Sequence, residues 1–187
     1  MTTSNLTHKG QLVETPPFIN MLFNDKRAAI LWLFVRLWLG WQWIQSSLPK
    51  LENPAWMQSG EALQGFWTRA IQVPAEGRPP IAYDWYRTFI EYMLNSGSYV
   101  WFAKLVAIGE LIIGIALIAG IFVGISAFLS GFMNWNFIMA GSASVNGVFF
   151  AISVFLILAW KVAGYLGADY FLLPRLAKLW SPKNEAQ

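Results

Sequence analysis

Six polar or charged side chains lie in or beside the most apolar stretches of the sequence, where residues of these types could hold a polar ligand. They are Arg36, Gln42, Lys104, Glu110, Asn134 and Asn136. An ionisable group among apolar residues is costly unless a partner neutralises it. Because a guanidinium can bind a carboxylate through two parallel hydrogen bonds, we predict that Arg36 pairs with Glu110.

The positions of these two residues agree with such a pair if each lies on a membrane-crossing helix. Arg36 follows Arg27 by nine residues and Glu110 follows Ser98 by twelve, which is about 14 Å and about 18 Å along a helix. Two antiparallel helices would bring the charges together near the middle of a hydrocarbon layer about 30 Å thick. The pair could fix helix register only, or it could line a pocket for a polar head group. The sequence leaves both alternatives open.

The composition predicts that membrane-spanning helices hold these residues. Hydrophobic residues make up 56% of the chain and charged residues 12%, against about 25% charged in soluble domains. Residues 111–160 contain no Asp, Glu, Lys or Arg. This stretch is too long for one span of about 20 residues, and it lacks the alternation of a membrane β-strand. We therefore predict an all-α membrane protein, with spans at residues 27–47, 98–121, 124–142 and 146–167.

Short connections between the last three spans predict an antiparallel four-transmembrane-helix bundle. The bundle would form a single membrane domain over residues 27–180, between a flexible N-terminal arm (1–26) and a flexible tail (181–187). Lys and Arg near both chain ends favour a cytoplasmic location for both termini. We expect a protein that crosses the plasma or inner membrane several times.

The outer segment, residues 48–96, contains two stretches with helical spacing of apolar residues. Asn53-Pro54 is a good helix start, and the sequence VPAEGRPP separates the two stretches. We predict short amphipathic helices that lie on the bilayer surface or fold over the bundle as a lid. They could also be interfacial helices with no site beneath them.

Residues that are rare in the sequence exclude several kinds of chemistry. The chain has no Cys, and its one His is His8, so thiol redox centres, iron–sulfur clusters, His-ligated haem and typical metal sites are not expected. A formal net charge of +3 gives no reason to expect a nucleic-acid partner. The sequence shows no redox centre of its own, and its catalytic residues, if any, stay unknown.

Four motifs resemble those of a known family of small membrane proteins. They are RLWLGWQWIQSSLPKL, GELIIGIALIAGIFVG, MNWNFIMAGSASVNG and AGYLGADYFLLPRL. Over residues 30–176 the chain resembles the DoxX family, and most of all its DoxD-like branch, which is identified as the membrane subunit of thiosulfate:quinone oxidoreductase. The motif residues are Arg36, Lys50, Gly109, Glu110, Asn134, Asn136, Gly141, Ser142, Ser144 and Asn146.

The resemblance implies a membrane subunit of a quinone-linked redox complex, with a bound menaquinone or ubiquinone and a protein partner that supplies the electrons. Arg36 and Glu110 would organise the quinone site. Gln42, Lys104 and the two Asn amides would donate hydrogen bonds to a quinone carbonyl. The alternative is a non-catalytic accessory subunit that packs against a larger respiratory or photosynthetic complex, or against further copies of itself. A transporter is a third possibility, although the spans show no clear repeats.

Overall fold

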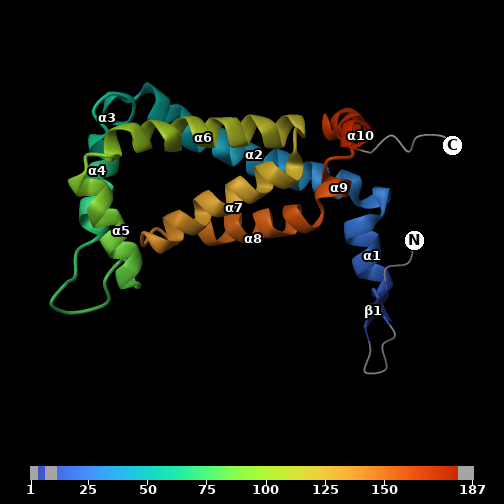
Figure 1. Cartoon of the computed structure of the whole chain (residues 1–187), viewed down its shortest axis with the longest axis horizontal. Helices are drawn as coiled ribbons and strands as arrows, with labels where there is room; N and C mark the ends of the chain where they lie inside the picture. The colour runs from blue at the N-terminus through green and yellow to red at the C-terminus, as the bar shows by residue number, and fades with distance from the viewer. Residues whose placement is uncertain (1–3, 7–11, 181–187) are drawn as a thin grey trace.

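The computed structural model of the chain describes residues 4–6 and 12–180, and it is all-α apart from one short hairpin (Figure 1). Strands β1 (Ser4–Leu6) and β2 (Leu12–Glu14) pair antiparallel. Helix α1 (Pro17–Asn24) and the 3-10 turn η1 (Lys26–Ala28) follow. The segment that we expected to be a flexible arm therefore contains regular structure. The tail expected at 181–187 lies outside the described residues.

Two helix pairs form the body of the molecule. Helix α2 (Ala29–Glu52) packs along α6 (Tyr99–Ala119), and α7 (Val123–Met139) packs along α8 (Asn146–Leu158). The pairs meet mainly through α6 and α7 (Figure 1). These helices lie where the four spans were predicted, except that the fourth is interrupted at Ala159 and continues as α9 (Trp160–Ala163). Among the described residues, α6 is the one helix long and apolar enough to cross a membrane, while α7 and α8 are apolar but shorter.

Two outer helices were predicted, and the structure has three at one end of the body, because the first predicted stretch is broken at residues 58–60. They are α3 (Pro54–Met57), α4 (Glu61–Ala70) and α5 (Asp84–Asn95), opposite the end that carries α1 and α10 (Asp169–Trp180) (Figure 1). The helix start predicted at Asn53-Pro54 is confirmed, because the Asn53 side chain accepts a hydrogen bond from the Ala55 N–H at 2.9 Å. Both α3 and α4 pack against α6, so they cover this end of the bundle.

A buried chain of hydrogen bonds joins the two helix pairs. The Trp43 indole N–H on α2 donates to Ser130 Oγ on α7 at 2.8 Å, and Ser130 Oγ lies 2.8 Å from Ser153 Oγ on α8. Ser153 in turn donates to the Phe149 carbonyl at 2.7 Å. Each hydroxyl has one proton, so the direction of donation runs from α2 through α7 to α8. All of these side chains are satisfied without water.

Two glycines set the contact between α2 and α6. A Cβ on Gly40 would lie 2.8 Å from the Gly114 carbonyl oxygen, and a Cβ on Gly114 would lie 2.9 Å from the Gly40 oxygen and 2.8 Å from Ile44 Cγ1. No side chain fits at such distances, so the two backbones approach closely, as small residues allow in helix–helix contacts. Because Gly40 faces Gly114, the register of the antiparallel pair is determined.

Substitution Gly114→Ala is expected to lower the free energy of unfolding by about 1–3 kcal/mol, because the added methyl group meets backbone that cannot move aside. Gly109→Ala on the same helix is the matched control. Its Cβ would meet nothing closer than Met133 Sδ at 3.8 Å, so a change between zero and about 1 kcal/mol in favour of the fold is expected from helix propensity. Unfolding in mixed micelles, followed by tryptophan fluorescence, measures both. Equal effects would contradict the close contact.

Candidate functional site: a polar cavity beneath the outer helices

The predicted ion pair between Arg36 and Glu110 is wrong. The Arg36 guanidinium donates to the carbonyl oxygens of Leu117 at 2.8 Å, Ile118 at 3.3 Å and Leu166 at 2.9 Å. Glu110 instead accepts from Lys50. Each charged group therefore has partners, but at two separate places, and Arg36 Nε has no hydrogen-bond partner among the described residues.

Helix register explains the failure of the predicted pair. Because Gly40 faces Gly114, Arg36 lies opposite the last turn of α6. The carbonyls that it reaches are seven and eight residues beyond Glu110, about 11 Å further along the helix axis. The prediction measured depth from assumed helix ends, which cannot establish which residues of two helices face each other.

The Arg36 cluster fastens the turn between α6 and α7 to the C-terminal part of the chain. A Cβ on Gly120, which has φ +70°, would clash with the guanidinium, and Gly167 packs against the same group. The Asp169 carboxylate accepts hydrogen bonds from the N–H groups of Phe122 at 2.6 Å and Val123 at 2.8 Å, at the start of α7. Backbone donors at a helix N-terminus favour a carboxylate. This cluster has a structural role.

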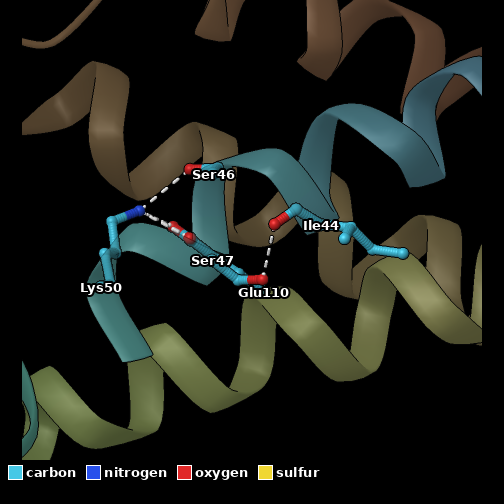
Figure 2. Close-up of polar contacts among 5 residues, drawn as sticks. All are labelled: Ile44, Ser46, Ser47, Lys50 and Glu110. Carbon is cyan, nitrogen blue, oxygen red and sulfur yellow. Dashed lines mark hydrogen bonds and ion pairs between the residues drawn. The ribbon is translucent and has the colours of Figure 1, made fainter. Parts of the chain in front are cut away.

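Lys50 on α2 and Glu110 on α6 form an ion pair (Figure 2). Lys50 Nζ donates to both carboxylate oxygens of Glu110, at 2.6 and 2.5 Å, and to Ser46 Oγ at 3.0 Å. The Glu110 side chain is fully buried, whereas the Lys50 side chain is 20% exposed. Lys50 also lies 5.3 Å from the centre of the Trp56 ring. Since an ammonium has three N–H donors, this lysine has none left for a ligand.

A cavity of about 680 Å³ opens beside this pair, between the helix pairs and under α3 and α4. Its walls combine aromatic rings with polar groups. The aromatic residues are Trp43, Trp56, Phe66, Phe137 and Phe149. Ligand sites commonly have volumes of about 300–1,000 Å³ and apolar walls with a few placed polar groups. The cavity is the candidate binding site.

Three of the six predicted site residues line this cavity, namely Gln42, Glu110 and Asn134. Arg36, Lys104 and Asn136 are not among its lining residues. Asn136 lies on the other side of α7, where its side-chain and backbone oxygens accept from the Tyr86 hydroxyl on α5 at 3.2 and 3.1 Å. Burial of that hydroxyl raises the pKa of Tyr86 to about 12, so it stays a donor at physiological pH.

Six polar lining residues were not predicted as site residues: Gln45, Ser46, Lys50, Arg69, Ser142 and Asn146. Lys50, Ser142 and Asn146 do occur in the motifs that carry the family resemblance, so that signal was present in the sequence. Arg69 is on α4, and although the outer helices were predicted to lie on the bilayer surface or fold over the bundle as a lid, no residue of this helix was predicted to line a site. Its guanidinium lies near Gly65, where an added Cβ would come within 3.5 Å of it.

One buried polar atom in the lining residues lacks a partner. Asn134 is fully buried, and its side-chain N–H donates to the Ser130 carbonyl at 2.9 Å. Its side-chain oxygen receives no hydrogen bond from the described residues. A buried acceptor without a donor costs about 1–3 kcal/mol.

The aromatic walls and the few polar groups of the cavity suit an organic ligand. In the part of the chain that the structure describes, no three His, Asp or Glu residues are grouped as metal ligands would be. Gln42, Gln45 and Arg69 carry side-chain N–H donors in the cavity wall, whereas Lys50 is held by Glu110 and Ser46. Comparison of the chain with protein-family models, with curated proteins and with solved structures finds no match.

Proposed function

We propose that the chain is a multi-pass membrane protein in which α2, α6, α7 and the α8–α9 segment each cross the bilayer. The support is the apolar surface of these helices. Phe34 on α2, Ile112 on α6 and Phe128 on α7 are exposed by 67%, 59% and 59%, and many similar residues surround them. Soluble monomers rarely expose contiguous apolar patches larger than a few hundred Å². Lipid would cover this surface.

We further propose that α1 and α10 lie at the cytoplasmic face of the plasma or inner membrane, with both termini on that side. Lys26, Arg27 and Arg175 lie at this end of the molecule, in agreement with the excess of positive charge in cytoplasmic segments. Phe18 and Phe171 are exposed on α1 and α10, as expected for helices in the interfacial layer. Helices α3, α4 and α5 would then face outward.

The ligand that we propose for the cavity is a quinone, and the chain would act as the quinone-positioning subunit of a DoxX-type redox complex. The observation that carries this proposal is the cavity itself, which places aromatic rings beside a buried Lys50–Glu110 pair. A flat apolar ring fits between aromatic walls. Three further motif residues of the family resemblance, Asn134, Ser142 and Asn146, line the same cavity.

The residues divide into two roles in this proposal. Lys50 and Glu110 position α2 against α6 and so keep the shape of the cavity wall. They do not bind the quinone, because the hydrogen bonds of Lys50 to Glu110 and Ser46 leave this lysine without a free donor. Gln42 and Arg69 supply donors to a quinone carbonyl. The chain holds and orients the quinone, and a partner subunit supplies the electrons.

Purified protein is expected to bind decylubiquinone or menadione, with quenching of tryptophan fluorescence from the cavity wall as the readout. Substitution Ala62→Phe adds a ring where the side chain lines the cavity and is expected to weaken binding at least tenfold by occupying the ligand volume. Thr68→Phe on the same helix is the control, because Thr68 is exposed and does not line the cavity. Absence of binding to both probes, or an equal loss of affinity in both variants, would contradict the proposal.

A second candidate is an accessory subunit without chemistry of its own. One observation favours it, which is an exposed aromatic stripe on α7. Phe128 stacks on Phe132 with ring centres 6.4 Å apart, and Phe132 stacks on Trp135 at 6.1 Å. Aromatic residues are enriched in protein interfaces. Co-purification of a larger complex at fixed stoichiometry, lost on Phe132→Ala and retained on Ala62→Phe, would separate this function from quinone binding.

A further inference from the structure

The unpartnered side-chain oxygen of Asn134 determines which chemical group of a ligand is favoured beside this residue. The orientation of this amide is held on α7, because its nitrogen donates to the Ser130 carbonyl. The side-chain oxygen is therefore the atom without a hydrogen-bond partner, and an amide oxygen can only accept. A ligand satisfies it by bringing a hydroxyl or an N–H to this point.

Two other residues that line the cavity offer donors instead of an acceptor. Arg69 has only donors, and Gln42 can donate through its amide nitrogen. Lys50 is engaged with Glu110 and Ser46. A well-matched ligand therefore carries a donor at one end and an acceptor at the other.

We propose that the cavity binds the reduced hydroquinone in preference to the oxidised quinone, an inference that rests on the proposed quinone site. A quinone carbonyl only accepts, so it would set a second oxygen lone pair against Asn134 Oδ1. A hydroquinone hydroxyl donates to that oxygen, while the second hydroxyl oxygen accepts from Arg69 or Gln42. Asn134 Oδ1 is closed to solvent, so the side chains that cover it move aside as the hydroxyl enters.

The test is a pair of titrations on the full-length protein, with decylubiquinone and decylubiquinol, and with menadione and its reduced form. We expect the reduced form of the bound probe to bind about tenfold more tightly, the effect of one well-placed hydrogen bond to a buried acceptor. For a two-electron couple, a tenfold preference raises the midpoint potential of the bound probe by about 30 mV. Asn134→Leu should reduce the ratio to about one, because the reduced form loses a hydrogen bond and the oxidised form is freed from the lone-pair repulsion.

Asn136→Leu is the matched control. Asn136 is on the same helix and makes the same type of hydrogen bond, to the Phe132 carbonyl at 2.8 Å, but its oxygen already accepts from Tyr86 outside the cavity. The preference should persist in this variant. If Asn134→Leu does not fold, Asn134→Ala removes the same oxygen without added bulk.

The possible outcomes are distinct. Equal affinity for the two redox forms, or tighter binding of the oxidised form, overturns the preference and leaves the quinone site standing. A preference that survives removal of Asn134 overturns the role of its oxygen. Failure of every probe to bind in either form overturns the proposed function, and the preference with it.

Discussion

Replacement of Arg36 by methionine is expected to lower the free energy of unfolding by about 3–5 kcal/mol, as for the loss of one partner from a buried ionic cluster. Three carbonyl oxygens, those of Leu117, Ile118 and Leu166, would lose their side-chain donor. Asp169 would lose the positive charge that acts on it. The yield of folded protein and its unfolding in mixed micelles measure the effect.

Arg27→Met is the control for this experiment. Arg27 is an exposed arginine at the start of the same helix region, and its loss is expected to change stability by about 0.5 kcal/mol or less. A double variant, Arg36→Met with Asp169→Asn, should be less destabilised than the sum of the single variants, because neighbours in one network are not additive. Additive effects, or a mild effect of Arg36→Met alone, would show that the cluster does not fasten the turn.

Lys50→Met and Glu110→Gln are each expected to destabilise the fold by about 3–5 kcal/mol, because each leaves one member of a buried pair without its partner. The Glu110 carboxylate is fully buried, and Lys50 supplies two of its hydrogen bonds. The double variant, Lys50→Met with Glu110→Gln, removes both charges and should recover much of the loss. A double-mutant cycle in mixed micelles gives the coupling energy.

Lys161→Met is the control for the lysine substitution, since Lys161 is exposed and lies on α9 at the other end of the molecule. Its effect is expected to stay within about 0.5 kcal/mol. If the double variant is as unstable as the worse single variant, the pair stabilises the fold through packing or its other hydrogen bonds, and the proposed positioning role of the charges fails.

The sequence was sufficient to predict the long helices of the body, because apolar runs of helical length leave few alternatives. The outer helices were also predictable, since Asn53-Pro54 begins one and apolar spacing marks the others. Helix α1 was missed, although Pro17 at its first position is a known start signal. The break at Ala159 was missed as well, because neither glycine nor proline marks it.

The site was predictable only in part, because ion pairing depends on how two helices align. Glu110 and Asn134 were identified from their unusual surroundings, and both line the cavity. Their contacts depend on Gly40 facing Gly114, a tertiary contact that no local pattern indicates. Arg69 was missed for a similar reason, since its relation to the cavity comes from the packing of α4 on α6.

The residues that contact the Arg36 guanidinium are synthesised long after Arg36 itself. Leu166 is 130 residues away in sequence, and at the usual speed of a ribosome this segment emerges on the order of ten seconds after the arginine. In a chain inserted during translation, the guanidinium would therefore find Leu117 and Ile118 when α6 arrives and would remain without its third carbonyl partner until the segment with Leu166 follows. Chains truncated before Leu166 should therefore insert poorly and be removed by cellular quality control.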